Sequence, residues 1–97
     1  MDQLIIDAIS DKSIISFYYD GRLRIAEPHV FGIKNNKKSI LCWQIRGESS
    51  RGNLPEWRRF ELAKILSLET ISEKFLGKRP FPSGKHSEWD ETICIVS

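Results

Sequence analysis

The chain has 97 residues, of which 40% are hydrophobic and 29% are charged. This length corresponds to one domain with a single modest core, and the composition excludes a chain that is disordered throughout. The net charge is only +2, but Gly21 to Lys64 carries ten Lys or Arg against four Asp or Glu. A basic middle section indicates an anionic partner, with an unevenly charged but merely solvated surface as the alternative.

Two cysteines, Cys42 and Cys94, lie in apolar surroundings, where a free thiol behaves as a small buried hydrophobic side chain. A disulfide between them stays open, but there is no framework of four or six cysteines of the kind that secreted domains use. The N-terminus lacks the basic start of a signal peptide, and no apolar run is long enough to span a bilayer. We therefore expect a cytoplasmic protein without a membrane segment.

The first part of the chain predicts a helix followed by a hairpin. Apolar side chains recur at helical spacing over residues 2–11, and Asp2 suits the N-cap of this short amphipathic helix. Residues 13–19 are rich in β-branched and aromatic side chains and predict a strand. Asp20-Gly21 then predicts a tight turn, since glycine accepts a positive φ without steric cost.

The middle of the chain predicts further strands. A strand over residues 22–27 meets Pro28, which cannot donate to a ladder and so indicates an edge, a bend or a bulge. Residues 30–33 and 39–46 are strand-like, and the polar residues 34–38 form the turn between them. The 39–46 strand is apolar on both faces, which indicates a central position in the sheet.

The remaining elements are a long loop over residues 47–56, a strand over 57–62 and an extended run over 64–69. Residues 71–75 are predicted to form a short turn or helical piece, and residues 92–96 a last strand. Four or five short strands with tight hairpins predict a mainly β domain, either a small barrel or a curved antiparallel sheet with one short N-terminal helix.

No constellation for catalysis or metal binding is recognisable. His29 and His86 have no helical spacing to each other or to a carboxylate, and we expect His29 to be structural or at the surface. Cys42 lies in a core strand, where a thiol is inert. There is no Cys-x-x-Cys or His-Glu-x-x-His spacing and no glycine-rich phosphate loop. We expect no enzymatic activity, no metal and no cofactor.

Arginines lie among aromatic residues in two places. The first cluster is Phe17, Tyr18, Tyr19, Arg22 and Arg24, and the second is Trp57, Arg58, Arg59 and Phe60. Guanidinium groups bind phosphate and carboxylate bidentately, and rings stack on bases. If the strands are neighbours, these side chains form one binding face; alternatively, the rings are core and the arginines cap the edge of the sheet.

The order of these motifs over residues 4–75 resembles the WYL domain of bacterial transcription regulators. The best matches are Arg24-Ile-Ala-Glu-Pro28 and Arg58-Arg-Phe-Glu-Leu-Ala-Lys-Ile65. This chain has Ser39-Ile-Leu41 where the family carries Trp-Tyr-Leu, and a lysine at Lys64 where arginine is usual. The resemblance implies one domain over residues 1–97, with a small Sm-like five-stranded barrel as its core.

The resemblance also implies a function. WYL domains are thought to bind a nucleotide or single-stranded nucleic acid on a basic face and to pass that state to a regulatory partner. Carried over by position, Arg24, Arg58 and Lys64 contact the anionic ligand, and Tyr19 supplies a ring or hydroxyl beside them. No helix-turn-helix region precedes the short helix, so direct reading of the DNA major groove is not expected.

A second function class remains open. Four large apolar side chains exceed what a core of this size readily encloses, and exposed patches mark protein interfaces: Phe31, Trp43, Trp57 and Trp89. A protein-interaction or homodimerisation module, pairing through an edge strand, is therefore the alternative. Residues 76–97 are an extension that follows the region of resemblance, and residues 77–97 either complete the barrel of their own chain or pack on a neighbouring copy.

Overall fold

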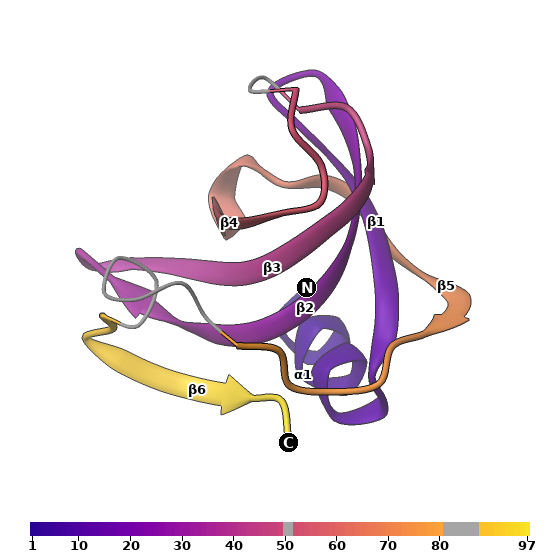
Figure 1. Ribbon diagram of the computed structural model, residues 1–97. Coiled ribbons are helices and arrows are strands. Elements are labelled where there is room, and N and C mark those ends of the chain that lie inside the picture. Colours follow the sequence, from indigo (N-terminus) through magenta and orange to yellow (C-terminus); the bar gives the residue numbers. More distant parts are fainter. Residues whose placement is uncertain (50–51, 81–87) are drawn as a thin grey trace.

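The computed structural model describes residues 1–49, 52–80 and 88–97. The elements in chain order are α1 Asp2–Asp11, β1 Ser13–Tyr19, β2 Arg22–Lys34, β3 Lys37–Gly47, β4 Glu56–Glu61, the 3-10 helix η1 Leu62–Lys64, β5 Leu66–Lys74 and β6 Glu91–Ile95. The strands form one antiparallel sheet in the order β4-β3-β2-β1-β5, and β6 pairs with β2 (Figure 1).

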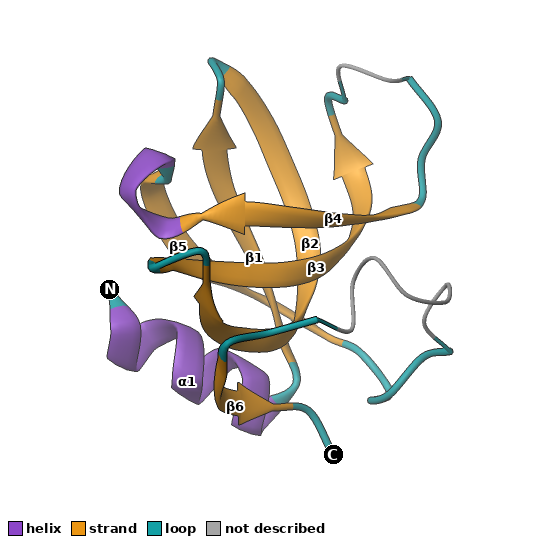
Figure 2. Cartoon of the chain, turned by 90° about the vertical axis from the view of Figure 1, so that its left-hand side faces the viewer, coloured by secondary structure: helices purple, strands orange, loops and turns teal. Residues whose placement is uncertain are grey.

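The expectation of a mainly β fold with one short N-terminal helix is confirmed, in its curved-sheet form. The sheet bends strongly but does not close, because β4 and β5 form no ladder with each other in the described part of the chain. Only η1 connects them, at the left of Figure 2. There are six described strands and not five, since β6 adds to the same sheet.

The helix α1 spans the predicted residues and packs against β1, β2, β5 and β6. Ile5, Ala8 and Ile9 are buried on its inner side, as the periodicity predicts. The assignment of Asp2 as N-cap is wrong, because Met1 occupies that position. Asp2 is the first helical residue, where its charge favours the helix dipole, and it accepts a hydrogen bond from Lys38 Nζ at 2.6 Å.

The two hairpin turns follow the residue chemistry. Asp20 and Gly21 have φ values of 54° and 71°, and Asn35 and Asn36 have 52° and 63°. Two successive residues in the left-handed region are what a two-residue hairpin loop needs to match the twist of its strands. Gly, Asp and Asn tolerate this region best, so the sequence fixes both turns locally.

The strand β2 is continuous through Pro28, where two separate strands were expected. Its pairing with β3 shifts register between Pro28 and Val30, so the proline lies at a bulge, one of the three positions predicted for it. The first half of β2 pairs with β1 and the second half with β6. The prediction of a turn or helical piece over residues 71–75 is wrong, because β5 continues to Lys74.

β3 lies inside the sheet between β4 and β2, as predicted, and both faces of the sheet carry apolar clusters. The inner face, with α1, holds the main core, which includes Ile15, Phe17, Ile40, Cys42 and Phe60. The outer face holds a smaller cluster of Val30, Leu41 and Trp57, with Trp43 and Trp89 packed against it. Cys42 is buried, Cys94 is half-buried, and both thiols are free.

Candidate anion-binding site

The fold brings Arg24 and Arg58 to one place, although they lie on different hairpins. Arg24 is opposite Phe17 in the β1–β2 ladder, and Arg58 is opposite Cys42 in the β3–β4 ladder, so both project from the inner face. Arg24 Cζ lies 5.6 Å and Arg58 Cζ 5.5 Å from the centroid of the Phe60 ring. Two guanidinium groups therefore share one aromatic ring.

Arg24 is completely buried, with a relative exposure of 0%. Its Nη1 donates to Gln44 Oε1 at 3.4 Å and its Nη2 to the backbone oxygen of Tyr19 at 3.2 Å. Within the described residues, Nε has no hydrogen-bond partner and no carboxylate forms an ion pair with this guanidinium. Burial, followed by the charges of Arg58 and Arg22, lowers the pKa of Arg24 from its ordinary value. The site therefore contains a buried cation whose charge is only partly compensated.

Tyr19 belongs to the same cluster. Its ring meets Phe60 edge-on, with the centroids 4.9 Å apart, and lies 6.0 Å from Arg24 Cζ. Its hydroxyl accepts a hydrogen bond from the backbone N–H of Glu61 at 3.2 Å. Lys64, on η1, is exposed and lies 3.9 Å from a carboxylate oxygen of Glu61. The structure thus groups three of the four predicted site residues and places Lys64 beside Glu61.

A second cluster of charged groups was not found from the sequence. Glu27, on β2, is buried, and its Oε1 lies 3.0 Å from His29 Nε2. Arg79 donates to both oxygens of the same carboxylate, from Nε to Oε1 at 2.7 Å and from Nη2 to Oε2 at 2.8 Å. Burial works to raise the pKa of Glu27, but the hydrogen bonds from Arg79 and His29 outweigh it, and the net shift is downward. The arrangement ties the C-terminal part of the chain to β2.

His29, expected to be structural or at the surface, is fully buried. Its ring lies 4.9 Å from that of Trp57 and 5.1 Å from that of Phe75, centroid to centroid. Burial lowers the pKa of His29, although the hydrogen bond with Glu27 acts in the opposite direction. The i, i+2 spacing of Glu27 and His29 places both on one face of a strand, a signal that could have identified this pair. Nothing in the spacing points to Arg79.

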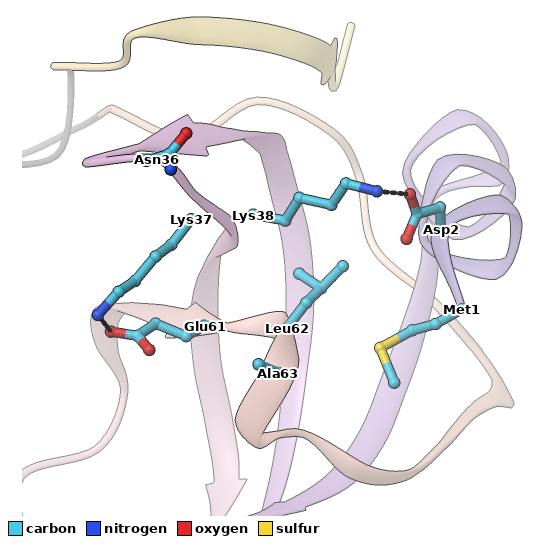
Figure 3. Close-up of a pocket in the computed structure, with 8 residues that line it drawn as sticks. All are labelled: Met1, Asp2, Asn36, Lys37, Lys38, Glu61, Leu62 and Ala63. Atoms are coloured by element: carbon cyan, nitrogen blue, oxygen red, sulfur yellow. Dashed lines mark hydrogen bonds and ion pairs between the residues drawn. The ribbon is translucent and has the colours of Figure 1, made fainter.

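A pocket of about 470 Å³ lies between the start of α1, the β2–β3 hairpin and η1 (Figure 3). Lys38 reaches Asp2 and Lys37 reaches Glu61, so the charged groups at its rim are paired with each other. Leu62 supplies apolar surface. Segments far apart in sequence form this pocket, so no local sequence motif predicts it.

The described residues contain no group of three or more His, Cys, Asp or Glu placed to hold a metal ion. Across the same part of the chain, no helix has the length and apolar character that crossing a membrane requires. In comparisons with known proteins, no family, no curated protein and no solved structure matches this chain.

Proposed function

We propose that this chain is a divergent, Sm-like sensor module of the WYL kind that binds an anionic ligand, a nucleotide or a short single-stranded nucleic acid. It acts in the cytoplasm without catalysis and passes its bound state to a regulatory partner. The observation that carries the proposal is the convergence of Arg24 and Arg58 on Phe60, with no ion pair to Arg24 among the described residues.

The electrostatics favour an anion at this place. Burial and then the positive charge of Arg58 lower the pKa of Arg24, so the protonated guanidinium of Arg24 is destabilised where it lies. A phosphate group near both would relieve that repulsion and accept charge-assisted hydrogen bonds. Because Arg24 has no exposed surface, the ligand contacts Arg58 directly, and Arg24 contributes its charge from beneath.

Titration of a fluorescein-labelled oligothymidine of about 12 nucleotides, with ATP as competitor, tests this proposal by fluorescence anisotropy. We expect Arg58→Ala to weaken binding about tenfold or more, since one charge-assisted contact is lost. The matched control is Arg46→Ala, which removes the same charge from an exposed pair with Glu73. The affinity should also fall as salt rises. Equal affinities of the wild type and Arg58→Ala, for both probes, would refute the proposal.

Homodimerisation is the second candidate, and β6 is the observation that favours it. Ile93 and Ile95 are 39% and 51% exposed, and β2 is the only described strand that pairs with β6. The four residues predicted to form an exposed patch do not carry this role: Phe31 and Trp57 are buried, and Trp43 and Trp89 are half-buried. Light scattering over a concentration series decides, because Ile93→Lys should convert any dimer to a monomer.

A further inference from the structure

A second, smaller pocket adjoins the first at the Lys37–Glu61 pair, which lines both. Its volume is about 250 Å³, below the range of about 300–1,000 Å³ typical of sites that enclose a drug-sized ligand. The lining side chains come from β1, β2, β3 and β4 and are mostly polar: Tyr19, Lys34, Lys37, Ser39, Arg59 and Glu61. Such a pocket is large enough for a single small polar group.

Three of these side chains are cations, and the carboxylates that face them are held loosely. Lys37 lies 3.7 Å from Glu61, and Lys34 lies 3.7 Å from Glu88, whose side chain is 73% exposed. Long ion pairs of this kind, each with one well-exposed partner, contribute little free energy, and an incoming anion can replace the carboxylates at small cost. Arg59 lies over the ring of Trp89 at 4.6 Å, which fixes the position of its guanidinium.

Two hydroxyl groups add directional donors. Tyr19 and Ser39 are 7% and 2% exposed, yet both line the pocket. The Tyr19 hydroxyl accepts from the N–H of Glu61 and still has its own proton to donate. In residues 1–49, 52–80 and 88–97, no acceptor binds either hydroxyl. Hydroxyl donors without acceptors at the wall of a pocket, beside three cations, form a site that an oxyanion would complete.

We propose that this pocket binds one phosphate group, either as free phosphate or as the terminal phosphate of a nucleotide. The cations supply charge, and the hydroxyls of Tyr19 and Ser39 supply oriented hydrogen bonds. Neither Arg24 nor Arg58 lines this pocket, so the inference does not depend on the function proposed above. Tyr19 contributes to both places, and a ligand with a phosphate here would lie close to the arginine cluster.

Titration of the full chain with inorganic phosphate, AMP and adenosine, at constant ionic strength and followed by ¹H–¹⁵N NMR, tests the proposal. We expect phosphate and AMP to shift the amides of Asn35, Ser39 and Glu61, and adenosine to leave them unchanged. The double variant Lys34→Ala/Lys37→Ala should weaken phosphate binding about tenfold or more, because two charge-assisted contacts are lost. Tighter binding of AMP than of phosphate would identify a nucleotide as the source of the group, and equal binding would identify free phosphate.

Two further variants separate a built site from diffuse attraction. Ser39→Ala keeps every charge and removes one donor, so it should weaken phosphate binding several-fold, whereas diffuse attraction would be unaffected. Glu88→Gln should strengthen binding because it removes a competing carboxylate. Lys78→Ala, the matched control, removes a positive charge outside the pocket and should change nothing. Absence of phosphate shifts in the wild type, or equal phosphate affinity of Ser39→Ala and the wild type, would overturn the proposal.

Discussion

Arg24 illustrates, at the scale of one residue, how a cation can be retained where it adds little to stability. Its guanidinium is fully buried, its two hydrogen bonds are to neutral acceptors, and its Nε has none within the described residues. Burial of a charge is costly unless the charge is paired and fully hydrogen-bonded. The flanking rings of Tyr19 and Phe60 compensate only in part.

We therefore expect Arg24→Met to change the free energy of unfolding by no more than about 1 kcal/mol. Removal of the buried charge stabilises the fold, whereas the loss of partners for Gln44 and the Tyr19 carbonyl destabilises it by a similar amount. Urea denaturation measures the difference, and Arg24→Lys, which keeps the charge, serves as the control. A loss of about 3 kcal/mol or more would show instead that Arg24 is a structural residue.

His29 makes stability depend on pH in a definite direction. Burial lowers its pKa below the ordinary value of about 6.5, so the unfolded chain binds a proton more readily than the folded chain. The groups that face its ring are Glu27 and, across the shared carboxylate, Arg79, with Trp57 and Phe75 packed against it. The contribution of neutral His29 to stability is therefore fully present above about pH 6.5 and decreases as the pH falls toward the lowered pKa of the folded state.

The measurement compares urea unfolding at about pH 7.5 and about pH 5.5 for the wild type and His29→Gln. We expect the wild type to lose up to about 1 kcal/mol more than the variant, which has no titrating group at this position. Glu27 remains ionised over this range, because its pKa lies below the ordinary value. His86 is present in both proteins, so any effect it has on the pH dependence is the same in both. An identical pH dependence of the two proteins would contradict the assignment of this pH dependence to His29.

At the scale of elements, Gly32 determines how closely β6 approaches β2. A Cβ at this position would lie 2.7 Å from Cε3 of Trp89 and would also collide with the backbone oxygen of Glu91. Gly32→Ala should therefore displace β6, reduce stability by about 1–3 kcal/mol and accelerate amide hydrogen exchange at Cys94. In the control, Gly21→Ala, the added Cβ meets nothing within 4 Å, although the φ of 71° strains the turn between β1 and β2. Hydrogen exchange at Cys94, relative to exchange in β1, is therefore the readout: Gly21→Ala should leave this ratio unchanged, and an equal rise of the ratio in both variants would rule out this packing role.

The sequence predicts the elements that local chemistry determines and misses those that depend on distant partners. β1 is predicted well because β-branched and aromatic residues fill it, with Ile15, Phe17 and Tyr19 buried at every second position, and the Asp20-Gly21 turn fixes its hairpin. β5 is largely exposed and has no such alternation, so its second half resembles a turn. The continuity of β2 through Pro28 depends on a bulge against β3, which strand propensities do not encode.

The candidate site likewise combines features that the sequence predicts with features that depend on distant partners. The sequence predicts that Arg24 and Arg58 converge if their strands are neighbours, and the strand order makes their hairpins adjacent, but the burial of Arg24 requires Gln44 and Phe60 from other strands. The ion pair between Glu27 and Arg79 spans 52 residues of chain, and no spacing rule reaches that far. Tertiary packing, which sequence patterns specify only collectively, decides these features.

At the scale of the whole molecule, the Arg79–Glu27 pair couples the C-terminal part of the chain to the sheet. The side chain of Glu27 is 4% exposed and that of Arg79 is 43% exposed, whereas the side chains of Arg46 and Glu73 are 48% and 49% exposed in their own pair.

Arg79→Ala leaves the buried carboxylate of Glu27 with His29 as its one remaining hydrogen-bond partner among the described residues. We therefore expect the free energy of unfolding, measured with urea at neutral pH, to fall by about 2 kcal/mol. Arg46→Ala breaks a pair that water already solvates, so its cost should stay below about 1 kcal/mol. Adding Glu27→Gln to Arg79→Ala should recover part of the loss, because the unpaired buried charge is then removed. Equal losses for Arg79→Ala and Arg46→Ala, without recovery in the double variant, would mean that the Arg79–Glu27 pair stabilises the fold no more than an exposed ion pair does.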